Sequence, residues 1–166
     1  VRAVIGSVSQ IEYLNDLSEV NILKSYQKLT SAWLSKYLLA HYQDISKAFN
    51  DIAVITGNKG LGKMMEDKWN LNKVYEISIP TQRSDLNSEA GKMHWPDRYE
   101  EVIGELKKLP KGTLVFVGAG LLGKSYCSYS KTIGLSSIDV GHVADIWYGK
   151  STRPGVRNEL VEKWKF

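Results

Sequence analysis

The sequence predicts a three-layer α/β fold, in which helices cover both faces of a mostly parallel sheet of four to five strands. Three observations lead to this prediction. Short apolar runs rich in β-branched residues alternate along the chain with stretches whose apolar residues recur every three or four positions. Neither an internal repeat nor an interdomain linker interrupts the alternation. Strand and helix in this rhythm form a parallel sheet between helices, so we expect one domain over residues 1–166.

The first half of the chain shows the alternation clearly. "VRAVIG" at the start could add a strand, and apolar residues recurring from Tyr26 predict a helix that continues towards Phe49. "DIAVITGN" is a short β-branched run and predicts a buried strand. "KGLGKMMEDKWN" predicts a short helix after a glycine turn. In "KVYEISIP", apolar residues alternate up to Pro80, which predicts a strand near an edge of the sheet.

The second half begins with a long loop. Residues 82–96 lack periodicity and are mostly polar, and long loops in compact domains often carry function. After the loop we expect helices over 96–109, 121–134 and 143–149, and strands over 113–118 and 136–141. In parallel sheets, ligands bind beyond the carboxyl ends of the strands. The site should therefore be built around the residues that follow the predicted strands, Gly57, Pro80, Gly118 and Gly141.

Composition and charge limit the function classes. The hydrophobic content of 43% and charged content of 24% are those of a soluble globular protein, and no apolar run could form a transmembrane helix. The single cysteine, Cys127, fits a reducing cytoplasm and reads as a small buried side chain. Most of the net charge of +4 lies in residues 150–166. A nucleic-acid-binding domain would spread a basic face over its elements, so no nucleic-acid partner is expected. We expect a solvated tail, although it could also meet phosphates or an anionic membrane surface.

The stretch "TLVFVGAGLLGKSY" matches two phosphate-binding patterns at once. Gly118, Gly120 and Gly123 form G-x-G-x-x-G, the dinucleotide fingerprint. Gly118, Gly123, Lys124 and Ser125 form G-x-x-x-x-G-K-S, a P-loop. In either pattern, backbone N–H groups at the start of a helix would face phosphate.

Each pattern has a weakness in its context. Few residues follow Ser125, too few for the strand–helix units of a P-loop NTPase, although Asp139 could bind Mg²⁺. The near-copy "GNKGLGK" is followed by Met64, which cannot bind Mg²⁺. For the dinucleotide pattern, Asp139 ends a predicted strand at the position where a ribose-binding carboxylate would lie. An NAD(P)-binding oxidoreductase therefore remains an alternative interpretation. However, at least two predicted strands precede the motif, and no hydride-transfer pair is evident.

A structural interpretation also remains open. The sole role of the three glycines could be to let a helix pack closely on its strand. The chain would then be a non-catalytic nucleotide-binding or structural module. Lys124 at the helix start argues for function, because a cation there opposes the helix dipole.

A further interpretation comes from a family resemblance. "VFVGAGLLGKSYCSYSKTIGLSSIDVGHVADIWYGKSTRP" resembles the C-terminal part of bacterial glycosyltransferases of the GT-D type. In that family an apolar strand leads to a glycine turn and a Lys-bearing helix, and a later strand ends in Asp-Ile-Gly-His or Asp-Ile-Gly-Ser. "VITGNKGLGKMM" and "VYEISIPTQ" are similar to upstream segments of the family. The matching positions are Gly57, Gly60, Gly62, Gly118, Lys124, Gly134, Asp139, Gly141 and His142.

The resemblance implies a Rossmann-like fold and transfer of a sugar from a nucleotide-sugar donor, most simply a UDP-sugar, to a glycan or protein-linked acceptor. Such an enzyme is expected in the cytoplasm or peripherally at the inner membrane face, and it could form a homodimer. The family holds Mg²⁺ or Mn²⁺ on the donor with a D-x-E pair, but neither D-x-E nor D-x-D occurs here. The chain begins at Val1 without Met, so it could be the C-terminal portion of a longer glycosyltransferase, whose N-terminal segment would supply metal ligands.

The site residues follow from the pattern and the resemblance. Charge on the leaving diphosphate would be neutralised by Lys124, Arg153 and the backbone N–H groups around Gly118, Gly120 and Gly123. The other loop at the same edge would contribute Thr56, Gly57, Asn58 and Lys59.

Asp139 and His142 are the catalytic candidates. Asp139 could bind a sugar hydroxyl or act as base on the acceptor, and His142 could move a proton or contact phosphate. Structural roles are the alternatives: Asp139 could pair with Lys124 or cap a helix, and Arg153 could pair with an acidic neighbour. The aromatic residues Trp95, Trp147 and Tyr148 could stack on a base or sugar or lie in the core.

Overall fold

The computed structural model describes residues 34–80, 94–153 and 156–166. The chain divides into two compact units, residues 1–38 and residues 39–166. Within the first unit the structure describes a short helix, α2 (Leu34–Tyr37), and the strand expected at the start of the chain lies outside the described residues. The sheet, the helices that cover it and the pocket all belong to the second unit.

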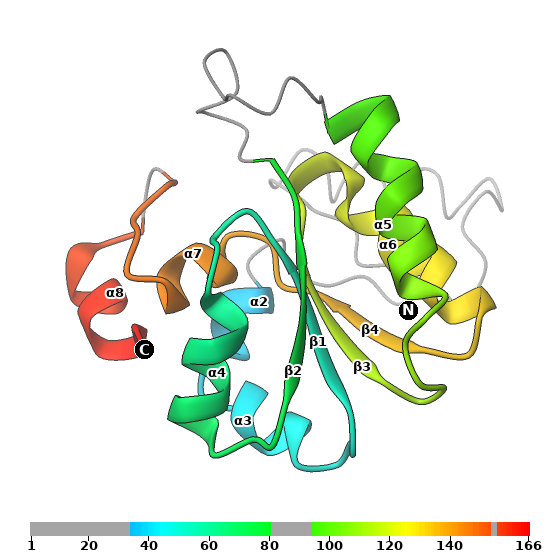
Figure 1. The fold of residues 1–166 in the computed structure, drawn as a ribbon. Coiled ribbons are helices and arrows are strands. Elements are labelled where there is room, and N and C mark those ends of the chain that lie inside the picture. The colour runs from blue at the N-terminus through cyan, green and yellow to red at the C-terminus, as the bar shows by residue number, and fades with distance from the viewer. Residues whose placement is uncertain (1–33, 81–93, 154–155) are drawn as a thin grey trace, which may run out of the picture. The chain divides into compact units, whose positions relative to one another are not determined.

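The second unit is built on a four-stranded, all-parallel sheet, which confirms the predicted α/β fold (Figure 1). The strand order is β2-β1-β3-β4. The β1 strand is buried along its whole length, as its β-branched run predicted, and β2 lies at an edge of the sheet. The strands are β1 (Ile52–Thr56), β2 (Val74–Ser78), β3 (Leu114–Gly118) and β4 (Ser136–Asp139).

Helices cover both faces of the sheet. One face carries α5 and α6, and the opposite face carries α3, α4 and α7 (Figure 1). The helices are α3 (Tyr42–Ser46), α4 (Leu61–Trp69), α5 (Tyr99–Leu106), α6 (Gly123–Thr132), α7 (Val143–Trp147) and α8 (Asn158–Trp164), with a π-type turn η1 (His94–Arg98) and a 3₁₀ turn η2 (Gly120–Leu122). Gly134, at φ 83°, follows α6 as expected for a helix stop.

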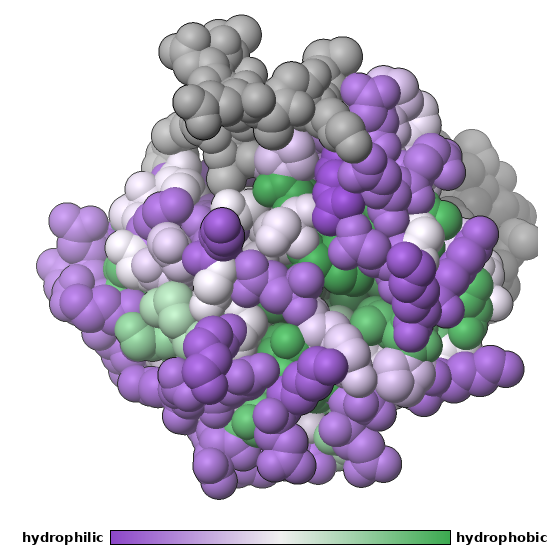
Figure 2. Space-filling view, in the orientation of Figure 1, coloured by the Kyte–Doolittle hydropathy of each residue, from purple (hydrophilic) through white to green (hydrophobic). Residues whose placement is uncertain are grey.

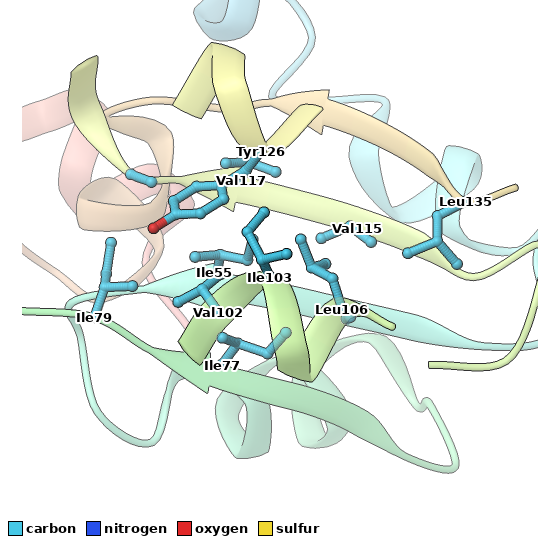
Figure 3. Close-up of a cluster of buried hydrophobic side chains, with 12 residues drawn as sticks. Ile55, Ile77, Ile79, Val102, Ile103, Leu106, Val115, Val117, Tyr126 and Leu135 are labelled. Atoms are coloured by element: carbon cyan, nitrogen blue, oxygen red, sulfur yellow. The ribbon is translucent and has the colours of Figure 1, made fainter. Parts of the chain in front are cut away.

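The core beneath α5 and α6 is aliphatic. Alternate residues of β1, β2 and β3 point to this face, because side chains along a strand alternate between its two faces. Figure 3 shows them packed against α5 and the ring of Tyr126 from α6. The cluster includes Ile55, Ile77, Ile79, Val102, Ile103, Leu106, Val115 and Val117.

The core on the opposite face is aromatic. Trp147 of α7 is fully buried at its centre, with ring centroids 5.2 Å from Tyr42, 5.2 Å from Trp69, 5.7 Å from Phe116 and 5.6 Å from Phe166. All but the last meet Trp147 edge to face, an arrangement that aromatic quadrupoles favour. Trp147 is therefore a core residue and does not stack on a ligand. The outer surface seen in the orientation of Figure 1 is mostly hydrophilic, with small separated hydrophobic areas (Figure 2).

Three sequence expectations differ from the structure. The helix expected towards Phe49 is interrupted: α2 ends at Tyr37 and α3 begins at Tyr42, so that the boundary between the two units falls in the turn between them. The helix expected from Pro96 is assigned as α5 only from Tyr99, and Pro96–Arg98 belong to the turn η1; the extended Trp95 (φ −121°, ψ 134°) directly before Pro96 is as expected for a residue that precedes proline. Residues 81–93 of the expected long loop lie outside the described residues.

The third difference concerns the basic tail. We expected a solvated segment, but it contains α8, and its apolar residues are part of the fold. Val156 and Val161 are buried, and the Phe166 ring stacks on Trp147 while its N–H donates to the Trp147 carbonyl at 2.9 Å. The basic side chains within and beside α8, Arg157, Lys163 and Lys165, are exposed, because apolar residues at intervals anchor the segment and leave these charged ones in water.

Candidate functional site

A pocket of about 420 Å³ lies at the carboxyl edge of the sheet. It is lined by the loop after β1 and the loop after β3. The two strands are adjacent, and their last residues, Thr56 in β1 and Gly118 in β3, are register partners. From β1 the chain passes to β2 on one side, and then returns to β3 on the other side. This is the topological switch point, where the two loops separate and ligands bind in open α/β sheets.

The structure brings part of the predicted site together in this pocket. The predicted residues that line it are Gly57, Asn58, Pro80, Gly118, Gly120, Gly141, His142 and Arg153. The others are placed elsewhere: Thr56 is buried in β1, Lys59 is exposed, and Gly123, Lys124 and Asp139 do not line the pocket.

Lys124 and Asp139 face each other. Lys124 Nζ lies 3.6 Å from Asp139 Oδ2, and the lysine side chain is 71% exposed. Asp139 Oδ1 also accepts the Gly141 N–H at 3.1 Å. The carboxylate lies against Gly123, where an added Cβ would be 3.2 Å from it. Asp139 thus closes its own loop, and Lys124 is oriented towards it, which is the ion pair we gave as the alternative.

Gly118 allows two elements to approach closely. A Cβ on Gly118 would lie 2.7 Å from the Ala144 Cβ, well inside van der Waals contact. The glycine therefore allows α7 to pack on the end of β3. The packing helix is α7, and not the α6 helix that follows the glycine loop.

The second glycine loop, which precedes α4, is occupied by a carboxylate of the chain. Glu76 Oε1 accepts the Gly60 N–H at 2.9 Å, and Glu76 Oε2 accepts the Gly62 N–H at 2.8 Å. A carboxylate at a helix N-terminus takes the position that a phosphate would take in a P-loop. In "GNKGLGK", the backbone N–H groups that would bind a phosphate in a P-loop therefore bind the Glu76 carboxylate.

Several residues that line the pocket were not predicted from the sequence, and three of them, Asp145, Lys150 and Thr152, form a network with Asn58. Asn58 Nδ2 donates to Asp145 Oδ1 at 2.8 Å, and Lys150 Nζ donates to Asn58 Oδ1 at 2.9 Å. Thr152 Oγ1 donates to Asp145 Oδ2 at 2.5 Å. Asn58 is 4% exposed, so its amide is a fixed part of the wall. A polar residue directly after a buried strand was the sequence signal for Asn58, but its partners lie about ninety residues away.

Another part of the lining is less polar. Ile79 and Pro80 follow β2, and His94 also lines the pocket. The His94 ring stacks on Tyr126, and its Nε2 lies 2.9 Å from the Tyr126 hydroxyl. Burial raises the pKa of Tyr126 well above its usual range, so this phenol stays neutral and can donate to the imidazole.

The remaining candidates have structural surroundings. Ser125 Oγ lies 2.7 Å from the hydroxyl of Tyr99, the first residue of α5, so the serine side chain hydrogen-bonds to that helix. Burial raises the pKa of the Cys127 thiol to about 11, so the thiolate is scarce and the residue behaves as a small apolar group. Trp95 is 59% exposed and packs at a tilt on Tyr99. The Tyr148 ring lies 4.7 Å from Lys150 Nζ.

Two features are absent from the described residues. None of the helices described for this chain is both long and apolar enough to cross a membrane. Within the same residues, no group of three His, Cys, Asp or Glu side chains is arranged to hold a metal ion.

Comparison of the chain with models of protein families, with curated proteins and with solved structures found no match in any of the three.

Proposed function

We propose that the pocket binds the diphosphate of a nucleotide sugar, and that the chain is the donor-binding part of a glycosyltransferase. The observation that carries this proposal is a pocket at the topological switch point whose wall contains Lys150, Arg153 and His142. Ligand pockets commonly have volumes of roughly 300–1,000 Å³, and about 420 Å³ falls within that range.

The charge of the pocket favours an anion. Neither Lys150 nor Arg153 forms an ion pair with a residue that the structure describes. Asp145 is the acidic residue of the lining, and both of its carboxylate oxygens accept hydrogen bonds from within the chain. Two cations, Lys150 and Arg153, and one carboxylate, Asp145, give the lining a net charge of +1 with its histidines neutral. Diphosphate is the group in a nucleotide sugar that such a wall suits.

The less polar wall suits the rest of the donor. Ile79 and Pro80 present apolar surface, and the His94 ring is held by its stacking on Tyr126. A planar base or a sugar ring can lie against such surfaces while the phosphates reach the cationic wall. This arrangement would orient the donor across the switch point.

The proposed transfer assigns a role to each group. The bond between the anomeric carbon and the diphosphate oxygen breaks as an acceptor hydroxyl attacks that carbon. Lys150 and Arg153 stabilise the negative charge that develops on the leaving diphosphate. His142 lines the same pocket and would take the proton of the acceptor hydroxyl, because a neutral imidazole is a suitable base near pH 7. Asp139 has no role in this step, because its carboxylate accepts the Gly141 N–H and faces Lys124.

Calorimetric titration of the chain with UDP, UDP-glucose, NAD(H) and ATP with Mg²⁺ tests the proposal. We expect UDP and UDP-glucose to bind with 1:1 stoichiometry, and Arg153→Met to weaken them by roughly one to two orders of magnitude, as for loss of a charge-assisted contact. Binding of NAD(H) alone would instead support the oxidoreductase alternative, and binding of ATP alone a P-loop-like site. Absence of heat with all four ligands would leave a structural module and refute the proposal.

A further inference from the structure

Asn58 connects a carboxylate to an ammonium group. Its Nδ2 donates to Asp145 Oδ1 at 2.8 Å, and its Oδ1 accepts from Lys150 Nζ at 2.9 Å. Asp145 is fixed in turn, because its other oxygen accepts from Thr152 Oγ1 and its backbone carbonyl accepts from the Lys150 N–H at 2.8 Å. The amide is buried, and both of its polar ends are used.

The amide keeps the two charges apart. Asp145 and Lys150 lie on the same wall, yet Lys150 Nζ has no carboxylate at ion-pair distance among the residues that the structure describes. Its contacts are the Asn58 carbonyl oxygen and the face of the Tyr148 ring, with 4.7 Å to the ring centroid. Both contacts hold an ammonium in place without adding a negative charge. The positive charge of Lys150 thus remains available to a ligand.

We infer that Asn58 is a positioning residue, and that it holds Lys150, with its charge uncompensated, as the cation that contacts the ligand's phosphate. The ligand part of this inference rests on the proposed function. The positioning part rests on the geometry of Asn58, Asp145 and Lys150 alone, so the two parts can fail separately.

Asparagine is the residue that this role requires. A carboxylate at position 58 would pair with Lys150 and would lie against the Asp145 carboxylate. The Asp145 carboxylate would raise the pKa of the introduced group and the Lys150 ammonium would lower it, and the group takes up a proton as the pH falls through the pKa that results. Once protonated, its hydroxyl can donate to Asp145 while its carbonyl oxygen accepts from Lys150, which restores the arrangement of the amide.

The test is the pH dependence of the Asn58→Asp variant. Dissociation constants for UDP and for inorganic pyrophosphate are measured for wild type and variant between about pH 8 and about pH 5. His94, His142, Arg153 and Asp145 face the same pocket, and the phosphates titrate too, so the ratio of variant to wild type at each pH is the quantity to compare. We expect the variant to bind roughly 10- to 100-fold more weakly at the high end, and the ratio to approach one as the pH falls. A ratio that does not change with pH would overturn the inference.

Charge removal provides a second variant that leaves Asn58 and its bond to Asp145 intact. Lys150→Met should weaken pyrophosphate and UDP binding by roughly one to two orders of magnitude. The matched control is Lys163→Ala, which removes the same charge from an exposed position on α8 and should leave binding unchanged. Equal effects of the two substitutions would show that Lys150 acts only through net charge and would refute its contact with phosphate.

A ligand-free measurement separates the positioning part from the proposed function. The amine of Lys150 is followed by NMR after reductive ¹³C-methylation, and its pKa is measured in wild type and in Asn58→Asp. We expect a higher Lys150 pKa in the variant, because a carboxylate replaces the amide beside it. An unchanged pKa would refute the positioning role even if UDP binds. If wild type binds neither UDP nor pyrophosphate, the proposed function and the phosphate contact fall together, while a shifted pKa would still support the positioning role.

Discussion

Substitution of Gly118 by alanine distinguishes a packing glycine from a phosphate-binding one. The added Cβ would lie 2.7 Å from the Ala144 Cβ, whereas carbon atoms in contact are separated by about 3.5–4.0 Å. The end of β3 and the helix α7 must therefore separate by about 1 Å, or one of them must distort. Overpacking of this kind typically costs about 1–3 kcal/mol. We expect Gly118→Ala to lower the free energy of unfolding by an amount in that range.

The matched variant is Ala144→Gly, which removes the opposing methyl group. Alone it should cost about 1 kcal/mol, because glycine is less favourable than alanine within a helix. In the double variant the clash with the Ala144 Cβ is absent, while contacts of 3.3 Å to the Gly141 carbonyl oxygen and 3.4 Å to the Ile55 carbonyl oxygen remain, so the two substitutions together should cost less than the sum of their separate costs. The measurement is urea denaturation of the four proteins, from which a coupling energy of about 1–3 kcal/mol is expected. Additive effects, or normal stability of Gly118→Ala with lost nucleotide binding, would refute the packing role.

Three further predictions concern other parts of the second unit. Trp147→Ala removes the centre of the aromatic core and should lower the free energy of unfolding by about 3–5 kcal/mol in chemical denaturation. The pKa of Glu66 is lowered, chiefly by the Val74 N–H, so its contribution to stability is present above the unfolded pKa and lost as the pH falls through the folded one. Glu66→Gln should therefore be less stable than wild type at neutral pH, and the difference should vanish in acid; a constant difference in pH-dependent melting would contradict this. Lys124→Ala should change stability by less than about 1 kcal/mol, because its ion pair with Asp139 is exposed, and a large loss of UDP affinity in titration would return Lys124 to the site.

The fold was largely predictable from local patterns. The β-branched run of β1 predicted a buried strand, and the alternation along the next strand predicted an edge, because burial on one or two faces determines the spacing of apolar residues. The break between α2 and α3 was not predictable, because apolar residues keep helical spacing across it.

The site was predictable only in its location. Loops that follow parallel strands meet at one edge, so Gly57, Asn58 and Gly118 could be placed there from the sequence. The partners of Asn58 could not, because its hydrogen bonds to Asp145 and Lys150 span 87 and 92 residues. Nor could the sequence show that Lys124 faces Asp139, because the lysine motif is the same whether its ammonium points to a ligand or to a carboxylate.

The position of Glu76 has a consequence for counting ligands. Both glycine-rich segments of the chain lie at the same edge of the sheet, and by motif alone each could hold one phosphate group. With Gly60 and Gly62 already bonded to the Glu76 carboxylate, a phosphate could enter the loop before α4 only by displacing an anion that is covalently part of the chain. Such an internal competitor is always present, at the same effective concentration whatever the amount of ligand added. A saturating titration should therefore end at one equivalent of nucleotide per chain.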